Sequence, residues 1–229
     1  MKEVDYKFWA NYLLDVVSEN LDTYFPSALE LGAGNCKMAD IISGRYANYI
    51  ASDLSSAMLK LNNKKSIKKI CCDMTFLPFK TKFDLIFSAF DSVNYLMTKK
   101  QLLKLFTEIR NLLSEEGIFT FDVSLEKNSL EFTNTYKIEA EANGYRFKRK
   151  SKYNPSTRIH KNTFKIIDKN GYIRKEIHKQ KIFKFHTYFK LIEEAGLFVV
   201  QCLDAFTFNN ANANCDRVQF ILKVDRSKC

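Results

Sequence analysis

The stretch that decides the fold is Glu30-Leu31-Gly32-Ala33-Gly34-Asn35-Cys36, because it places two closely spaced glycines between an apolar run and a helical pattern. Residues 28–31 are typical of a short buried strand, and residues 38–43 begin a helical periodicity. Glycines at a strand-to-helix turn let the backbone bend and approach a ligand without a Cβ clash. The stretch therefore predicts a nucleotide-cofactor site. Lys37 stands where a dinucleotide fingerprint has its third glycine, which argues against a nicotinamide cofactor.

The sequence on both sides of this turn alternates short apolar runs with helical patterns. A turn is expected at residues 114–117, before the last strand of this part. Strands that alternate with helices are typical of a parallel sheet covered by helices, so we expect an α/β core. The expected strands are residues 28–31, 49–52, 67–72, 83–87 and 117–123, and the expected helices are residues 6–19, 38–43, 56–62 and 100–113.

Two acidic residues follow the next two expected strands. Asp53 comes directly after residues 49–52, and Asp73 comes directly after residues 67–72. An acid at the first place can accept both hydrogen bonds of a ribose diol, and one at the second can accept from an adenine amino group. Taken singly, Asp53 also fits a turn or N-cap acid, and Asp73 a solvated loop acid. The ordered set with the glycine turn favours a nucleoside site at the carboxyl edge of the sheet.

The pattern changes after Val123. Consecutive strands are predicted at residues 136–141, 145–153, 158–167 and 172–183, joined by Asn143-Gly144, Asn154-Pro155-Ser156 and Lys169-Asn170-Gly171, which favour turns. The core pattern then resumes with a helix at 184–195 and strands at 197–203 and 217–224. We therefore predict a core of residues 1–124 and 184–229, with an inserted antiparallel sheet at 125–183.

The net charge of +10 is concentrated in this insert. Residues 143–190 contain 15 Lys and Arg, all three histidines, and only Asp168 and Glu176 as acidic residues. An acidic partner and a solvated lysine-rich strand surface both fit this distribution. Along residues 145–153, alternation places Arg146, Lys148, Lys150 and Lys152 on one face, as a solvated surface also would.

Four stretches of the chain carry a family resemblance. They are Glu30-Leu31-Gly32-x-Gly34, Ala51-Ser52-Asp53-Leu54-Ser55-x-x-Met58-Leu59, Cys72-Asp73-Met74 and Phe83-Asp84-Leu85-Ile86. Together they resemble the class I S-adenosylmethionine-dependent methyltransferases. Residues 90–96, the insert, and residues 176–180 and 191–196 resemble the small-molecule branch that includes sugar-amine N-methyltransferases. The resemblance implies a Rossmann-like sheet of order 3-2-1-4-5-7-6, with strand 7 antiparallel, and an inserted antiparallel β-sheet as a lid.

The resemblance also implies roles for individual residues. S-adenosylmethionine is the implied cofactor, S-adenosylhomocysteine the product, and no metal is needed. Glu30 would support the glycine turn and approach the methionine ammonium group, Asp53 would hold the ribose, and Asp73 would lie at the polar edge of the adenine. Cys36 stands where the family usually has a third small residue. The implied cofactor contacts are Glu30, Gly32, Ala33, Gly34, Asp53, Leu54, Met58, Asp73, Met74, Ser88, Ala89 and Phe90, with Asp91, Asn94 and Tyr95 facing the methyl group.

Methyl transfer requires an acceptor lone pair held in line with the S–CH3 bond and shielded from water. An amine acceptor must also lose a proton, so the candidate catalytic residues are Asp91, Tyr95 and His178, with His160 as a further candidate. Alternation places His178 on one strand face with Arg174, Glu176 and Gln180, which is typical of a site lining, although an outward histidine fits too. Arg146, Lys150, Arg158 or Arg174 would bind phosphate or carboxylate on the acceptor if they faced the cleft.

The predicted function is transfer of a methyl group to nitrogen or oxygen of a small molecule. An acceptor that carries phosphate or carboxylate is one such molecule. A nucleic-acid (RNA) methyltransferase stays open because of the basic insert, although residues 90–93 lack the Asp/Asn-Pro-Pro-aromatic signature of base amino methylation. A non-catalytic protein that binds S-adenosylmethionine also stays open.

The composition of the chain narrows the class of protein further. The chain has 229 residues, of which 46% are hydrophobic and 27% charged, which indicates a globular protein. No apolar run approaches the length of a membrane span, and residues 1–6 do not resemble a secretory signal, so we expect a cytoplasmic protein with no membrane partner. The six cysteines lack the spacing of a zinc site and are expected to be reduced thiols. The sequence does not indicate an oligomeric state.

Overall fold

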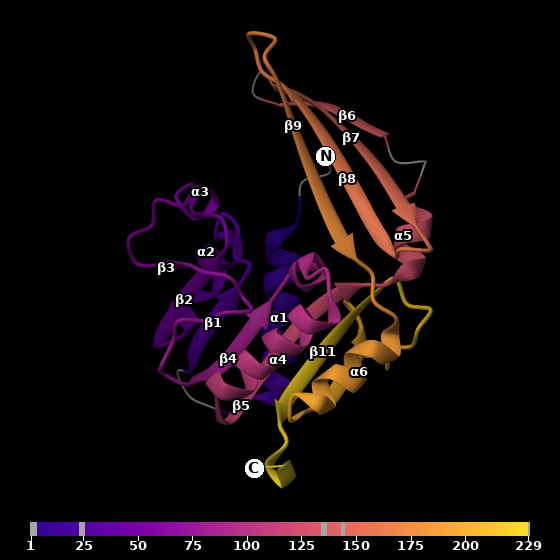
Figure 1. Ribbon diagram of the computed structural model, residues 1–229. Helices are drawn as coiled ribbons and strands as arrows, with labels where there is room; N and C mark the ends of the chain where they lie inside the picture. The colour runs from indigo at the N-terminus through magenta and orange to yellow at the C-terminus, as the bar shows by residue number, and fades with distance from the viewer. Residues whose placement is uncertain (1–3, 23–25, 134–136, 143–144, 229) are drawn as a thin grey trace.

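The computed structural model describes residues 4–22, 26–133, 137–142 and 145–228, and Figure 1 shows a core with a second sheet rising from one edge. Seven strands form the core sheet in the order β10-β11-β5-β4-β1-β2-β3. β11 is antiparallel to both of its neighbours, β5 and β10. The order 3-2-1-4-5-7-6 is therefore confirmed. The strands are β1 (Ser27–Leu31), β2 (Asn48–Asp53), β3 (Lys68–Cys71), β4 (Phe83–Ser88), β5 (Leu113–Ser124), β10 (Leu197–Asp204) and β11 (Arg217–Val224).

Helices cover both faces of this sheet. One buried cluster joins the sheet to α4 (Lys99–Leu112) and α6 (Phe185–Glu194), and a second joins it to α1 (Tyr6–Asn20) and α2 (Lys37–Ile42). α4 begins with a capping box, in which Thr98 and Gln101 bond each other's backbone N–H groups. The shorter elements are η1 (Ser43–Arg45), α3 (Ser56–Leu59), η2 (Ser92–Tyr95), α5 (Glu126–Glu131) and η3 (Arg226–Lys228).

The predicted turn at residues 114–117 is instead part of β5. Leu113 pairs with Phe83 and Ile118 pairs with Leu85, so residues 114–117 bulge from the ladder between these pairs. A Cβ on Gly117 would lie 2.8 Å from the carbonyl oxygen of Phe83. The glycine is therefore needed where two backbones approach closely within an irregular strand. In the sequence, a glycine at such a place looks the same as a glycine in a turn.

A separate antiparallel sheet, here called the lid sheet, has the order β6-β7-β8-β9. Its strands are β6 (Lys137–Ala142), β7 (Tyr145–Asn154), β8 (Ile159–Ile167) and β9 (Ile173–Lys181). Tyr136 and the predicted Asn143-Gly144 turn lie outside the described residues. The sequence reading did not predict α5, which connects β5 to this sheet.

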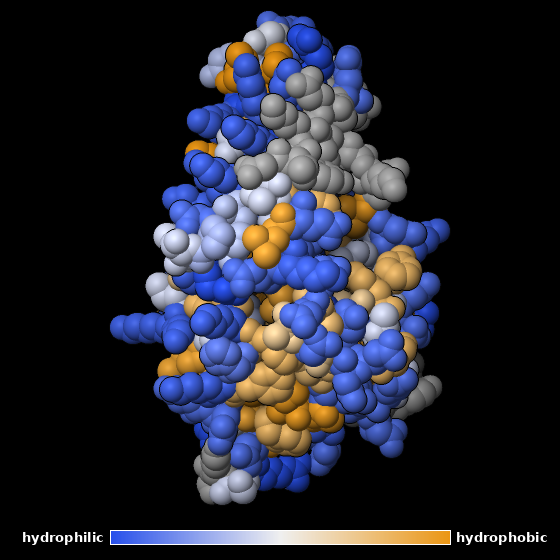
Figure 2. Space-filling model, turned by 90° about the vertical axis from the view of Figure 1, so that its right-hand side faces the viewer, coloured by the Kyte–Doolittle hydropathy of each residue, from blue (hydrophilic) through white to orange (hydrophobic). Residues whose placement is uncertain are grey.

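Side chains of the lid sheet alternate between two faces. The inner face contains His178, which contacts Tyr95 of η2, and Gln180, which contacts the Asp91 carbonyl just before η2. The neighbouring residues of β9, such as Lys179, lie on the outer face. β8 and β9 reach far above the core in Figure 1. In Figure 2, which views the side that carries α5 and α6, an apolar patch lies below the lid sheet. No helix among the described residues is long and apolar enough to cross a bilayer.

Candidate active site

The glycine turn packs directly against η2. Gly32 has φ +69°, and a Cβ at this position would lie 2.8 Å from the Cβ and Oγ of Ser92. Gly34 has φ +54° and also lies in the region that favours glycine. Cys36 adopts the same left-handed conformation at φ 60°, and its side chain is fully buried. Gly32 is thus required by the close packing of Ser92, whereas a Cβ on Gly34 would meet only the Met58 Cε at 3.7 Å, so the backbone at Gly34 is open to close approach. Cys36 fills the place of the third small residue.

Asp53 ties the glycine turn to the end of β2. Its Oδ2 accepts from the Gly34 N–H at 2.7 Å, and its Oδ1 accepts from the Ser55 N–H at 2.7 Å. A carboxylate has about four lone-pair positions, so both oxygens can still accept a hydroxyl donor. The turn-acid role and the ribose-binding role are therefore compatible at this residue.

Apolar side chains stand exposed beside Asp53. Leu54 is 73% exposed and Met58 is 39% exposed. The Met74 Cε lies 3.7 Å from the position of a Cβ on Gly32, so Met74 flanks the same turn. Large apolar side chains held open around a polar acid are typical of a site for a flat ring.

Asp73 lies at the end of β3, where the sequence predicts it. Its Oδ1 accepts from the Thr75 N–H at 2.7 Å and from Thr75 Oγ1 at 2.8 Å, which fixes the carboxylate in an exposed loop. Gly32, Gly34, Asp53 and Asp73 therefore meet at the carboxyl edge of the sheet, as expected for an adenosine site.

Glu30 lies beneath the turn rather than on its surface. The side chain is buried, and Oε2 accepts from Tyr49 Oη at 2.6 Å. Burial raises the pKa of Glu30 to about 7, against the opposing effect of the Tyr49 hydrogen bond. The carboxyl group therefore supports the turn from below, and a nearby cation would favour its charged form.

The raised pKa of Glu30 makes stability depend on pH. A group whose pKa is higher in the folded than in the unfolded state stabilises the fold below the unfolded pKa of 4.5, and this stability is lost as pH rises through about 7. Glu30→Gln removes the charge but keeps an oxygen for Tyr49. We expect Gln to leave stability nearly unchanged at pH 4 and to raise it by about 2–3 kcal/mol at pH 8. Urea unfolding at both pH values measures this, and equal effects at both would contradict it.

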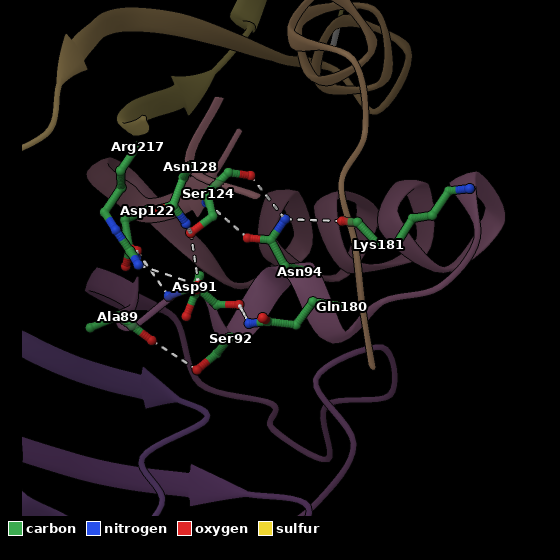
Figure 3. A network of polar contacts seen from close by, with 10 residues as sticks. All are labelled: Ala89, Asp91, Ser92, Asn94, Asp122, Ser124, Asn128, Gln180, Lys181 and Arg217. Carbon is green, nitrogen blue, oxygen red and sulfur yellow. Dashed lines mark hydrogen bonds and ion pairs between the residues drawn. The ribbon is translucent and has the colours of Figure 1, made fainter. Parts of the chain in front are cut away.

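A polar network holds the end of β4 (Figure 3). The Asp91 N–H donates to Asp122 Oδ2 at 2.8 Å, and Asp91 Oδ2 accepts from Ser124 Oγ at 2.8 Å and from Arg217 at 3.3 Å. Arg217 also pairs with Asp122. Burial raises the pKa of Asp122 to about 6, against the opposing charge of Arg217. One arginine thus joins Asp91, which precedes η2, to Asp122 of β5.

This network stabilises an unusual backbone. Phe90 and Asp91 have φ 59° and φ 48°, a left-handed conformation that costs energy for residues other than glycine. The Phe90 ring packs on Trp9 of α1, with centroids 4.2 Å apart, and Trp9 also stacks on Arg217. Phe90 can therefore line the site with its backbone, while its side chain anchors α1.

Asn94 fixes the lid sheet to the core instead of facing a ligand. It is fully buried; Nδ2 donates to the Lys181 carbonyl at 3.0 Å, and Oδ1 accepts from the Ser124 N–H at 2.9 Å. Ser124 ends β5 and Lys181 ends β9, so Asn94 binds the chain where it leaves the core and where it returns. The implied position beside the methyl group therefore does not match its surroundings.

Arg158 also has a structural place. Its Nη1 donates to Glu126 Oε2 at 2.6 Å, and its Nε donates to the Ile182 carbonyl at 2.7 Å. Glu126 accepts from Tyr153 Oη as well, at 2.6 Å. Arg158 thus holds the base of the lid sheet to α5. Of the four basic residues considered for an acceptor, only Arg174 lies on the inner face by register, where it pairs with Glu176.

Tyr95 and His178 meet across the space between η2 and the lid sheet. Tyr95 Oη lies 3.0 Å from His178 Nδ1, and His178 Nε2 lies 3.8 Å from Glu176 Oε2. Burial and the charge of Asp91 raise the pKa of Tyr95 to about 12, so the hydroxyl keeps its proton at neutral pH and can donate to Nδ1. This contact joins two predicted catalytic residues that are 83 positions apart in the sequence.

Other predicted residues lie close by in less accessible positions. Ser88 is buried and donates to the Leu31 carbonyl at 3.1 Å, which joins β4 to β1. Ala33 is buried and donates its N–H to the Ser52 carbonyl, and the Ala89 carbonyl accepts from Ser92 Oγ. His160 is buried, and this burial lowers its pKa, whereas His178 is partly exposed.

The sequence reading did not identify Arg217, Asp122 or Trp9 as site residues. Asp122 carried a signal, because an acidic residue inside an apolar strand needs a buried partner. Nothing in the sequence spacing indicates that this partner is Arg217, which is 95 residues further along the chain.

The sheet order, with its antiparallel seventh strand, and the acidic residues at the ends of β2 and β3 match the class I S-adenosylmethionine-dependent methyltransferase fold. Residues 28–117 match the family described as "Methyltransferase domain". Together with the fold, this match confirms the resemblance to the class I S-adenosylmethionine-dependent methyltransferases, a family whose cofactor is S-adenosylmethionine.

Relatives and solved structures agree with the resemblance to methyltransferases. The "Putative methyltransferase" of Geobacillus sp. (strain WCH70) is 25% identical over 233 residues, which cover 97% of this chain and 94% of the relative. An S-adenosylmethionine-dependent methyltransferase from Clostridium acetobutylicum ATCC 824 superimposes with a TM-score of 0.85 at 23% identity, covering 97% and 93% of the two chains. S-adenosylmethionine-bound CalS10, an amino pentose methyltransferase from Micromonospora echinaspora, gives a TM-score of 0.75 at 16% identity, covering 96% and 92%.

Proposed function

We propose that this chain methylates the nitrogen or oxygen of a small molecule held between η2 and the inner face of the lid sheet. The observation that carries the proposal is the 3.0 Å contact between Tyr95 Oη and His178 Nδ1, which brings a proton-accepting pair to the carboxyl edge of the sheet. Similarity to an amino pentose methyltransferase supports an amine on a sugar as the acceptor group.

The residues at the sheet edge fit S-adenosylmethionine. Gly34 leaves open space that a Cβ would enter, Asp53 has free lone pairs for a ribose, and Leu54 is exposed as a surface for a flat ring. When bound, S-adenosylmethionine supplies an activated methyl group on its sulfonium. The chain must then orient the acceptor, exclude water and remove one proton.

We assign the proton transfer to Tyr95, His178 and Glu176. The acceptor nitrogen would bond the methyl carbon as the S–CH3 bond breaks and S-adenosylhomocysteine is left. Its proton would pass to Tyr95 Oη, and the Tyr95 proton would pass to His178 Nδ1. The resulting imidazolium lies beside Glu176, whose Oε2 is 3.8 Å from His178 Nε2. Asp91 is less suited as the base, because its carboxylate is already bonded to Ser124 and Arg217.

An acidic group on the acceptor would interact with basic residues of the inner face. Arg174 and Arg149 lie on that face by register, whereas Arg146 and Lys150 lie on the outer face. Arg149 donates from Nε to Asn162 Oδ1 at 3.0 Å and stacks on Phe164, so its guanidinium is held in place. The proposal of an anionic acceptor therefore moves from Arg146, Lys150 and Arg158 to Arg149 and Arg174.

His178→Ala and Tyr95→Phe should each lower kcat about 100-fold, because each removes a step of the proton transfer. Affinity for S-adenosylhomocysteine should stay within about threefold. His186→Ala is the matched control, since His186 is an exposed histidine of α6 away from this site. The assay follows S-adenosylhomocysteine release and acceptor mass with amino sugars, free and linked to a nucleoside diphosphate. Unchanged kcat in both variants would overturn the assignment of the base, and cofactor binding without turnover of any acceptor would favour the non-catalytic reading.

A further inference from the structure

Cationic side chains form cross-strand rows on the outer face of the lid sheet. The register places Lys148, Lys165 and Lys175 side by side in one row. It places Lys152, Lys161 and Lys179 in a second row. The acidic residues at register positions of this face belong to β6, where Glu139 lies opposite Lys148 and Glu141 opposite Arg146. β8 and β9 contribute none to it, and all six lysines are exposed.

The two lysine pairs between β8 and β9, Lys165 with Lys175 and Lys161 with Lys179, are unfavourable for the isolated sheet. Like charges directly opposite each other on neighbouring strands destabilise a β-sheet, because they repel at close distance. Among the described residues, Lys161, Lys165, Lys175 and Lys179 have no acidic partner within ion-pair distance. An anionic partner would relieve this repulsion, so the surface is electrostatically suited to bind one.

The same face also exposes apolar side chains between the lysines. Along β9 the outward residues are Ile173, Lys175, Ile177 and Lys179, and the two isoleucines are 53% and 47% exposed. Tyr172 lies at the tip of the β8–β9 hairpin, just before β9 and outside its outer-face register, and is 74% exposed. This tip is the part of the lid sheet furthest from the core in Figure 1, and Figure 2 shows apolar side chains among hydrophilic ones at that end.

We propose that the outer face of the lid sheet binds the surface of an anionic lipid bilayer. Lysines near such a surface are attracted to the headgroups, and exposed isoleucine and tyrosine side chains fit the boundary between headgroups and acyl chains. The contact is peripheral and needs no spanning helix. It is independent of the proposed function, and it departs from the sequence expectation that the chain has no membrane partner.

Other partners fit this face less well. Lysine is depleted in the cores of protein interfaces, where aromatic residues and arginine are enriched. Surfaces that bind single-stranded nucleic acid combine positive charge with several aromatic side chains for stacking. The described outer-face register positions of β7, β8 and β9 hold no aromatic residue, and Tyr172 lies outside the strands at the tip. A second copy of the chain would bring lysine rows against lysine rows.

The test is sedimentation of the full chain with lipid vesicles. The chain should bind phosphatidylcholine vesicles that contain phosphatidylglycerol and should not bind phosphatidylcholine alone, and binding should weaken as salt is raised. Replacing Lys161, Lys165, Lys175 and Lys179 by glutamine should weaken binding at least 100-fold, because each lysine contributes about fivefold near an anionic surface. Ile173→Ser with Ile177→Ser should weaken it about tenfold.

The matched control replaces Lys65, Lys68, Lys99 and Lys100 by glutamine, which removes the same charge from exposed positions of the core. This control should bind vesicles within about threefold of the original chain. Thermal unfolding and S-adenosylhomocysteine affinity establish that each variant is folded; if the fourfold variant is not, Lys175→Gln with Lys179→Gln replaces it. No binding to phosphatidylglycerol vesicles, or equal losses in the outer-face and control variants, would overturn the proposal. Tighter, lysine-dependent binding to a single-stranded oligonucleotide would overturn it in favour of a nucleic-acid surface.

Discussion

Replacing Arg217 by methionine is expected to lower the free energy of unfolding by about 3–5 kcal/mol at pH 8. Methionine keeps much of the side-chain volume but leaves the Asp91 and Asp122 carboxylates close together without their cation. Asp122 is 1% exposed, so its charge has no access to water. The left-handed backbone at Phe90 and Asp91 loses part of its support at the same time. Urea unfolding measures the loss.

The same variant should show a particular dependence on pH. Asp122 already has its pKa raised to about 6 by burial, and removing Arg217 raises it further. Protonation of Asp122 then relieves the repulsion, so the loss of stability should be smaller at pH 5 than at pH 8. Arg226→Met is the matched control, because Arg226 pairs with Glu115 and Glu116 at an exposed site and should cost less than about 1 kcal/mol. A loss for Arg217→Met as small as that of the control would show that the network does not support the site.

Asp53→Ala is expected to weaken binding of S-adenosylhomocysteine by about 1.5–3 kcal/mol, which is roughly 10–150-fold. The substitution removes an acceptor for the ribose and also frees the Gly34 and Ser55 N–H groups that Asp53 now holds. Both effects act on the cofactor, because the glycine turn must keep its shape to receive it. Titration calorimetry gives the affinity directly.

Two further variants separate these effects. Asp53→Asn keeps one oxygen acceptor and should lose less affinity than alanine does. Asp15→Ala removes an exposed acidic residue of α1 and should leave affinity unchanged. Unchanged affinity in Asp53→Ala would mean that the cofactor lies elsewhere.

The α/β core and the position of the cofactor turn could be predicted from sequence because they depend on local patterns, whereas the sheet order followed from the family resemblance. Glycine spacing, the apolar runs of buried strands and an acidic residue after each of two strands are all visible within a few residues. The turn expected at residues 114–117 was wrong for the same reason, since Gly117 gives the local signal of a turn while the backbone of Phe83 sets its actual environment.

The parts of the site that could not be predicted from sequence depend on contacts between residues far apart in the chain. Arg217 reaches Asp91 from 126 positions away, and no spacing in the sequence indicates that contact. Arg158 was considered for the acceptor because of its charge, but Glu126, in a helix that was not predicted, holds it at the base of the lid sheet. Alternation did place His178 and Glu176 on one face, and it could not show that this face lies against Tyr95.

A crystal structure with S-adenosylhomocysteine tests the proposed methyl-transfer site most directly. We expect the methionine part along the backbone of Gly32 and Gly34, the ribose hydroxyls on Asp53, and the adenine between Leu54 and Met74. The sulfur should point toward the space between Tyr95 and the inner face of the lid sheet. Product bound away from the glycine turn, or with its sulfur directed away from Tyr95 and His178, would contradict the proposal.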